Sequence, residues 1–349
     1  MHQLKVKNII PQPNNNVTII FEDVHKKYPV PLPGQFLTLI FDLDGREVRR
    51  SYSFNNCSPC GEELSITVKR IDNGEISRLL HHRLEVGEIL NVLTPQGKFT
   101  YDSQTNSAKN IVLFAAGVGI TPLFSILKAI LYETEDTQIV LLYSNSSTQN
   151  TLFYDELKAF EEKFAERFTI IWLFSTSKNL LKARLNRDLI RDVMYDFSRD
   201  EIKKNTLIYT CGPVIYMDLC KFTLLGMGFS ENQILRETFQ LPENEEDEDD
   251  DTIKIVDTNT YSIELIFEGK KHAFDVPYNK SILDIALEEG LRIPYSCNSG
   301  MCSTCTSQCI QGNVRMVYNE VLTDNEVANG RCLLCTGHPT ENGTIIEVL

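Results

Sequence analysis

The chain has 349 residues, of which 42% are hydrophobic, and this length favours two or three domains over one core. Its 34 basic and 48 acidic residues give a formal net charge of −14, which argues against nucleic acid as a partner because duplex binding depends on neutralising phosphates. With no run of 18 or more apolar residues and no basic segment leading into an apolar stretch, we expect a cytoplasmic protein without membrane insertion.

Residues 1–104 read as antiparallel β structure. Short apolar and β-branched runs, such as VTIIF, FLTLIF and LSITVKR, alternate with Pro, Gly and Asn turns. This pattern predicts a small β-barrel. Within it, Cys57 and Cys60 in CSPC have the spacing of a thioredoxin motif, but they lack its strand-to-helix context, so we predict a loop there.

Residues 105–240 change to alternating strands and helices. The apolar strands IVLFAA, IVLLYS, FTIIWLF and TLIYT are interleaved with amphipathic stretches such as TPLFSILKAILYE and LFYDELKAFEEKF. This order predicts a parallel sheet covered by helices, as in α/β nucleotide-binding domains.

The first of these strands leads directly into GVGITP. Gly117 and Gly119 therefore lie at a strand-to-helix turn, where the backbone can approach a pyrophosphate. The third glycine of the dinucleotide fingerprint is absent, and Thr121 and Pro122 stand near its place. A plain tight turn remains the alternative.

The fourth strand ends in YTCGP, which places another motif at the same edge of the predicted sheet. Open α/β sheets bind their ligands at the carboxyl ends of the strands. Cys211, Gly212 and Pro213 are thus candidate nucleotide contacts, although Cys211 can also be read as an ordinary buried thiol.

The segment LPENEEDEDDDT, residues 241–252, is the clearest domain boundary. It contains eight acidic residues between positions 243 and 251 and no basic one, so its charges repel and nothing apolar drives it to pack. We interpret it as a linker, with a solvated loop of no further role as the alternative.

Beyond the linker, four cysteines have the spacing of an iron–sulfur site. A reducing compartment argues against a disulfide framework for the ten cysteines. Cys297, Cys302 and Cys305 form C-x4-C-x2-C, and Cys335 follows after 29 residues, which matches the plant-type [2Fe-2S] pattern. Tetrahedral zinc is the competitor, but it would leave Cys297 without a role. Cys332 is the rival for the fourth ligand.

Several motifs in order resemble the ferredoxin–NADP reductase family over roughly residues 1–240. They are PGQFLTL, RRSYSF, GVGITP and CGP. The resemblance implies that Arg50 pairs with the flavin diphosphate, Tyr52 contacts the isoalloxazine or ribityl chain, and Ser53 reaches toward N5. These roles suit a guanidinium, an aromatic ring and a hydroxyl.

Two further segments extend this resemblance. VKRIDNGEIS matches the second phosphate segment of the family, which implies that Gly74 and Ser77 contact the diphosphate and favours FAD over FMN. Glu237 and Phe239 in RETF fall where the family brings a carboxylate and an aromatic ring near the flavin, with a core Phe as the alternative. We therefore expect Ser53, Cys211 and Glu237 to line the reaction centre.

The coenzyme could be NADH or NADPH. Related NADPH enzymes often carry Arg after the second or third strand of this domain to pair with the 2′-phosphate. The corresponding stretches here, YSNSSTQN and FSTSKN, contain no Arg and only Lys178 as a base, so NADH is favoured.

The C-terminal part, residues 253–349, resembles the plant-type ferredoxin domain with its α+β β-grasp fold. The resemblance rests on SILDIALEEGLRIPYSCNSGMCSTC and LLC, and it places the fourth ligand at Cys335. Small residues, Ser299, Gly300 and Ser303, would let backbone amides turn toward the cluster sulfurs.

Together the three parts resemble the reductase components of multicomponent oxygenases, including those of phenylacetyl-CoA epoxygenase systems. The resemblance implies NAD(P)H-dependent electron transfer through FAD to a [2Fe-2S] cluster and on to a protein acceptor, expected to be an oxygenase component. A reductase for a ferredoxin, haem protein or desaturase and a redox-responsive binding module remain the alternatives.

Overall fold

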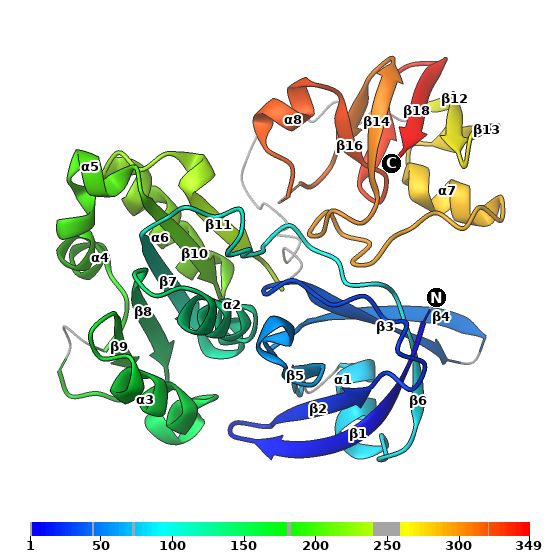
Figure 1. The fold of residues 1–349 in the computed structure, drawn as a ribbon. Helices are drawn as coiled ribbons and strands as arrows, with labels where there is room; N and C mark the ends of the chain where they lie inside the picture. Colours follow the sequence, from blue (N-terminus) through cyan, green and yellow to red (C-terminus); the bar gives the residue numbers. More distant parts are fainter. Residues whose placement is uncertain (1, 44, 72–73, 180–182, 240–258, 320) are drawn as a thin grey trace. The chain divides into compact units, whose positions relative to one another are not determined.

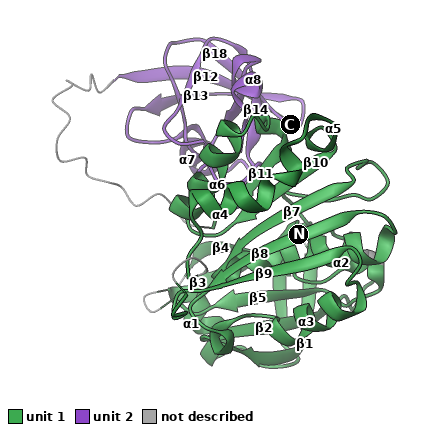
Figure 2. Ribbon diagram, turned by 90° about the vertical axis from the view of Figure 1, so that its left-hand side faces the viewer, with its two compact units in different colours: residues 1–239 green, residues 240–349 purple. Residues whose placement is uncertain are grey.

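The structure, a computed structural model, describes residues 2–43, 45–71, 74–179, 183–239, 259–319 and 321–349. The chain forms two compact units, residues 1–239 and 240–349, which Figure 2 colours separately. The predicted acidic linker, 241–252, lies outside the described residues. Among the helices of the described part, none has the length and apolar character needed to cross a membrane.

The first unit begins with the predicted antiparallel barrel (Figure 1). Its strands are β1 His2–Gln12, β2 Asn16–Glu22, β3 Phe36–Leu43, β4 Arg46–Ser53, β5 Ser65–Lys69 and β6 Ile89–Val92, in the order β4-β3-β6-β1-β2-β5. A bridge between Phe54 and Ile66 joins the two edge strands. A short 3-10 helix, Ser58–Cys60, and helix α1, Glu75–His82, lie on either side of β5 in the chain.

The barrel is held by alternation of its side chains. In β1, Leu4 and Val6 point into one buried cluster while their neighbours are half-buried or exposed, and Ile19 and Phe21 of β2 join the same cluster. This period of two is the reason these runs form strands with one face in the core.

The remainder of the first unit is a parallel five-stranded sheet. Its strands are β7 Asn110–Ala116, β8 Gln138–Asn145, β9 Phe168–Phe174, β10 Thr206–Cys211 and β11 Ile234–Glu237, in the order β11-β10-β7-β8-β9. Its helices are α2 Ile120–Glu133, α3 Tyr154–Lys163, α4 Arg187–Met194, α5 Asp200–Lys203 and α6 Val214–Gly226. Its described residues also form 3-10 turns at Gly117–Gly119, Thr148–Asn150, Asp196–Ser198 and Glu231–Gln233.

Two hydrophobic clusters cover the two faces of this sheet. Helices α2 and α3 contribute to the cluster that contains Ile126 and Leu157, and α4 and α6 contribute to the one that contains Ile190 and Leu224. Every residue of α2 from Ile120 to Leu131 is buried, because this helix packs on the sheet and also carries contacts to the barrel. The predicted α/β architecture is therefore confirmed.

The second unit has a mixed sheet with one longer helix. Its elements are β12 Thr260–Phe267, β13 Lys270–Pro277, α7 Ile282–Glu288, β14 Thr306–Gln311, β15 Val314–Met316, α8 Asp324–Ala328, β16 Arg331–Leu333, β17 Gly337–Pro339 and β18 Thr344–Val348. The main sheet has the order β13-β12-β18-β14-β16, with β12 and β18 parallel, and β15 pairs with β17. Helix α7 starts with a capping box between Ser281 and Asp284, which fixes where it begins.

Candidate functional sites: strand β4, a glycine turn and a thiol cluster

Strand β4 carries the three residues of the predicted flavin motif. Ser53 is only 4% exposed, and its Oγ has no hydrogen-bond partner within the described part of the chain. Leaving a buried hydroxyl unpaired costs about 1–3 kcal/mol, so this atom fits a position that a ligand acceptor completes. Burial raises the pKa of Tyr52, which keeps its ring neutral. The Arg50 guanidinium is exposed and donates to the Arg49 carbonyl oxygen at 2.7 Å.

Gly74 and Ser77 form the turn that begins α1. The Ser77 hydroxyl accepts a hydrogen bond from the Ile71 N–H at 3.1 Å, so it is engaged in the turn itself. A Cβ on Gly74 would lie 2.5 Å from Ser77 Oγ, which explains why the helix begins with glycine at its N-cap. Ser77 therefore supports the turn that presents the first N–H groups of α1.

The nucleotide turn and the CGP motif are packed backbone to backbone. A Cβ on Gly119 would lie 2.3 Å from the Cys211 carbonyl oxygen, and one on Gly212 would lie 2.9 Å from Ala116 Cβ. Gly117 has φ +55°, a conformation that glycine adopts without strain. The structure thus brings together two motifs that are far apart in the sequence, and glycine is what allows the contact.

Two tyrosines that the sequence reading did not single out fix this turn. The Tyr143 hydroxyl donates to the Gly117 carbonyl oxygen at 3.0 Å, and the Tyr216 hydroxyl donates to the Ala115 carbonyl oxygen at 3.1 Å. Burial raises the pKa of both phenols, so they remain donors. Both tyrosines are distant in the sequence from the carbonyl groups that they bind, so no local pattern could have predicted this role.

Thr121, Pro122 and Pro213 lie at the starts of two helices, α2 and α6. Thr121 is buried and donates to the Val118 carbonyl oxygen at 3.0 Å, and Pro122 is buried in the first turn of α2. Proline suits this position because its missing N–H would have no helical partner. Pro213 is exposed and lies at the N-cap of α6.

Cys211 and Glu237 stand opposite each other at the carboxyl ends of β10 and β11. Cys211 is fully buried, and burial together with the nearby Glu237 carboxylate raises the pKa of its thiol well above the ordinary value. The thiol is therefore protonated at neutral pH. Phe239, just beyond β11, is 41% exposed, so the alternative of a core phenylalanine is wrong.

Another residue at this sheet was missed. Trp172 in β9 is the single tryptophan of the chain, and it packs against Tyr154 and Phe174 with ring centroids 4.8 and 6.1 Å away. Its buried Nε1 lacks a hydrogen-bond partner within the described segments. That the chain has a single tryptophan is the feature of the sequence that could have drawn attention to it.

In the second unit, backbone amides surround the predicted cluster thiols. The Gly300 N–H donates to Cys335 Sγ and the Met301 N–H donates to Cys297 Sγ, both at 3.3 Å. Gly300 has φ +74°, and a Cβ there would lie 2.5 Å from the Tyr318 carbonyl oxygen. The loop can therefore turn its amides toward the sulfurs only with glycine at this position.

The four thiols are linked to one another through their effects on each other's pKa values. The contact with Cys302 lowers the pKa of Cys297, and the same contact raises the pKa of Cys302. Contacts with Cys297 and then Cys305 raise the pKa of Cys335, and the contact with Cys335 lowers that of Cys305. Adjacent thiols cannot all ionise without cations among them, and thiolates are the ligands that iron–sulfur clusters require. The donor set fits a cluster.

Cys332 interacts instead with the backbone of the neighbouring strand. It is buried in β16, and its Sγ is 3.7 Å from the Ser307 carbonyl oxygen. Burial raises the pKa of its thiol to about 12. This environment is that of a thiol donating to the backbone of the neighbouring strand.

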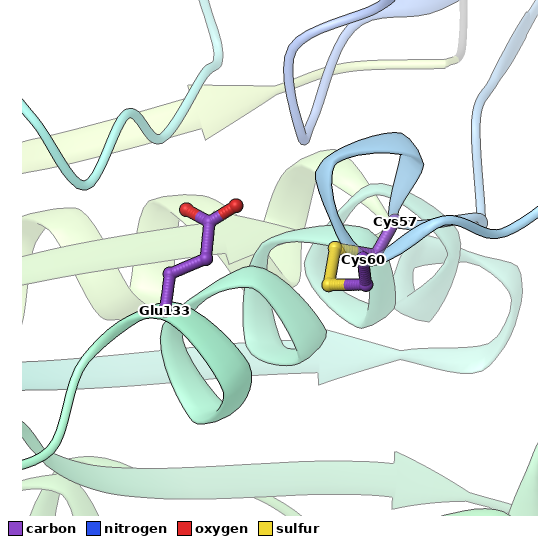
Figure 3. A group of neighbouring side chains, drawn as sticks. All are labelled: Cys57, Cys60 and Glu133. Atoms are coloured by element: carbon purple, nitrogen blue, oxygen red, sulfur yellow. A yellow bond between two sulfur atoms is a disulfide. The ribbon is translucent and has the colours of Figure 1, made fainter.

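The CSPC segment lies in the loop between β4 and β5, as predicted, but its two cysteines are bonded to each other. Cys57 and Cys60 flank and end the 3-10 turn Ser58–Cys60, and their sulfurs are joined in a disulfide of 2.01 Å. Figure 3 shows this pair beside Glu133 of α2. The argument against a disulfide framework did not anticipate this single bond, while the other eight cysteines are free thiols.

Comparison with known families assigns each domain. The model described as oxidoreductase FAD-binding domain matches residues 18–101, the oxidoreductase NAD-binding domain matches 113–221, and the 2Fe-2S iron-sulfur cluster binding domain matches 265–340. These matches include most of the barrel, most of the parallel sheet and the thiol cluster, respectively.

Similar proteins share this arrangement over almost their full length. The chain is 29% identical to a subunit of the 1,2-phenylacetyl-CoA epoxidase of Escherichia coli, covering 99% of this chain and 97% of that protein. It is 28% identical to the ferredoxin reductase component of 3-ketosteroid-9-alpha-monooxygenase of Rhodococcus rhodochrous, with coverages of 99% and 96%.

The fold is also similar to solved structures. Phthalate dioxygenase reductase aligns with a TM-score of 0.61 and 23% identity over 99% of this chain and 97% of that one. The chain is therefore an oxidoreductase that combines FAD, NAD and 2Fe-2S domains for electron transfer. Its C-terminal part carries the 2Fe-2S iron-sulfur cluster binding domain, and its homologues include subunits or reductase components of oxygenase systems.

Proposed function

We propose that this protein is the reductase component of an oxygenase system and supplies it with single electrons drawn from NADH. The observation that carries the proposal is the order of FAD, NAD and 2Fe-2S domains over the full chain. Relatives aligned over 96% or more of their length are named as subunits or components of an epoxidase and a monooxygenase. The acceptor of this chain is proposed by that likeness.

The residues of β4 hold the flavin in this proposal. Ser53 donates from its otherwise unpaired Oγ toward N5, Tyr52 packs on the ring system, and the exposed Arg50 pairs with the diphosphate. Gly74 and Ser77 present the start of α1 to the same diphosphate. The unpaired buried hydroxyl is the support for this assignment, because it is the atom that needs a ligand.

The carboxyl edge of the parallel sheet receives the dinucleotide. Gly117 and Gly119 bring the backbone and the start of α2 close to the pyrophosphate. Thr121 and Pro122 hold the first turn of α2, and Gly212 and Pro213 form the facing wall at the end of β10.

The nicotinamide end lies at Cys211 and Glu237 in this proposal. The neutral, buried thiol gives an apolar wall that excludes water, and the adjacent carboxylate offers a proton acceptor. Phe239 covers the flavin with its exposed ring. The bound FAD would take hydride from the nicotinamide, and the cluster would pass its electrons onward one at a time.

Cys297, Cys302, Cys305 and Cys335 are the proposed cluster ligands. Their mutual contacts and the amides of Gly300 and Met301 support this set. Amide donors stabilise negative charge on the sulfurs and so tune the potential of a cluster held there.

The proposed donor is NADH. The ends of β8 and β9, where a 2′-phosphate would need a cation, carry YSNSSTQN and FSTSKN, with Lys178 as their single base. We expect kcat/KM for NADH at least equal to that for NADPH in steady-state flavin-dependent ferricyanide reduction. A tenfold preference for NADPH would contradict the assignment.

The proposed function is tested by copurifying the terminal acceptor and reconstituting turnover. We expect NADH oxidation coupled to oxygenation by the copurified component, and we expect Cys335→Ser to abolish this coupling while ferricyanide reduction continues. Turnover with a ferredoxin, haem protein or desaturase but not with an oxygenase would assign the chain to that acceptor instead. Flavin and cluster binding without any turnover would indicate a redox-responsive binding module.

A further inference from the structure

The Cys57–Cys60 disulfide has no part in the proposed electron path. It lies in the loop between β4 and β5 of the barrel, four residues beyond Ser53. Cys57 is 0% exposed, whereas Cys60 is half-buried, so an incoming reagent reaches Cys60 first. A carboxylate oxygen of Glu133 lies within 4.8 Å of both sulfurs (Figure 3).

The backbone next to Cys57 is bound to helix α2. The Asn56 carbonyl oxygen accepts a hydrogen bond from Ser125 Oγ at 2.6 Å. The Cys57 N–H donates to Glu62 Oε2 at 2.7 Å, and Glu62 in turn pairs with Lys128. Both α2 partners are buried, so these contacts hold the loop in a fixed place.

Cys60 touches the same helix. Its Sγ lies 3.9 Å from the Lys128 carbonyl oxygen. The disulfide at Cys60 and the residue before Cys57 thus contact two successive turns of α2, at Lys128 and Ser125. Because α2 begins directly after the Gly117–Gly119 turn, the disulfide and the nucleotide turn share one rigid element.

We propose that Cys57 and Cys60 form a reversible dithiol–disulfide site that an external dithiol opens, and that opening it weakens NADH binding at the Gly117–Gly119 turn. The disulfide fixes the loop that holds α2. Once the bond is broken, the loop gains conformational freedom. Its contacts with Ser125 and Lys128 then cost more conformational entropy to form and are weaker. The start of α2 is then less well placed for the pyrophosphate.

The chemistry is a two-electron exchange. A thiolate of the external dithiol attacks Cys60 Sγ, the Cys57–Cys60 bond breaks, and Cys57 leaves as a thiolate that takes up a proton. The second thiol of the reagent loses its proton and attacks the reagent's own sulfur in the mixed disulfide, which releases Cys60 as a thiol. The reagent ends as a disulfide, and the pair gains two electrons and two protons. Glu133 is the group placed to pass these protons.

The first test follows the thiols in the full-length holoprotein. Air-equilibrated protein is alkylated before and after anaerobic incubation with dithiothreitol, and the peptide that contains both cysteines is analysed by mass spectrometry. We expect no label before reduction and two labels after it, with Cys60 modified first. Full labelling without reductant, or zinc bound to the pair in the purified protein, would overturn the proposal.

The second test measures NADH binding in both states after desalting. Stopped-flow bleaching of the flavin is recorded against NADH concentration, with cluster absorption monitored to confirm its retention. We expect the apparent Kd for NADH to rise at least threefold in the reduced protein and to return on reoxidation with a small disulfide. Equal Kd values in the two states would refute the control of NADH binding.

Variants separate this effect from general thiol chemistry. Cys60→Ser should show the raised Kd of the reduced protein and ignore dithiothreitol. Cys309→Ser, which removes another half-buried thiol in the second unit, should respond as the unmodified protein does. The second test relies on the proposed hydride path whereas alkylation does not, so loss of flavin bleaching in both states would count against the proposed function alone.

Discussion

Cys332 and Cys335 are three residues apart and have different surroundings. Cys335 Sγ accepts from the Gly300 amide and contacts the other thiols, whereas Cys332 Sγ faces the Ser307 carbonyl oxygen. We expect Cys335→Ser to lose the iron–sulfide absorption, because a hydroxyl is a poor substitute for a thiolate ligand. Cys332→Ser should retain it. Visible spectra of both variants, with NADH–ferricyanide activity as the folding control, decide the matter, and the reverse pattern would transfer the ligand role to Cys332.

His81 is expected to make the first unit less stable in mild acid. Burial lowers the pKa of His81 below the ordinary 6.5, despite its hydrogen bond to the Val68 carbonyl oxygen. The unfolded chain therefore binds this proton more readily, so stability is full above about pH 6.5 and falls as the pH drops below it.

The measurement is the Tm of the first unit, residues 1–239, between pH 7.5 and 5.5. His81→Gln should flatten the decline in Tm, while His82→Gln, at an exposed neighbouring position, serves as the matched control. An unchanged slope in His81→Gln would show that other groups carry the acid sensitivity.

At the scale of elements, the contact between the β7–α2 turn and the end of β10 is the tightest in the nucleotide site. Gly119→Ala would place a methyl group 2.3 Å from the Cys211 carbonyl oxygen, so backbone must move. We expect a loss of about 1–3 kcal/mol of unfolding free energy and a marked rise in KM for NADH. Gly226→Ala, whose Cβ would meet nothing within 4 Å, is the control. Unaltered NADH kinetics in Gly119→Ala would argue against the site.

Long apolar strands were predictable from the sequence, and short or paired features were not. Strands β7 to β10 contain continuous apolar runs that only a buried sheet accommodates, whereas β11 has four residues and no distinctive period. The proposed cluster cysteines could be picked out from the sequence because three of them lie within nine residues at the ligand spacing of a [2Fe-2S] site. The approach of Gly119 to Cys211 and the hydrogen bond from Tyr143 to Gly117 depend on tertiary packing, which no local pattern records. The Cys57–Cys60 bond was missed because a loop context gave no signal.

The whole molecule contains hydrophobic cores that divide cleanly between the two units. Within the described residues, three buried clusters consist of residues below 239, and the fourth consists of residues from Ile263 to Ile346. We therefore expect residues 1–239 to fold alone, bind FAD and reduce ferricyanide with NADH at a rate near that of the full chain. Flavin content and steady-state assays of the fragment test this. A fragment that aggregates or lacks flavin would show that the second unit is needed for folding.

Helix α2 connects the Gly117–Gly119 turn to the loop that contains the disulfide. In the proposed redox control, the state of each site therefore affects the other. The 14 residues of α2 span about 21 Å as a single rod. The coupling between the two sites is reciprocal. If NADH binds threefold more tightly to the disulfide form, saturating NADH must lower the equilibrium constant for reduction of the disulfide threefold. Threefold corresponds to about 14 mV in the midpoint potential of the pair. A high concentration of NADH would therefore favour the disulfide, and external dithiols would reduce it more readily when NADH is scarce.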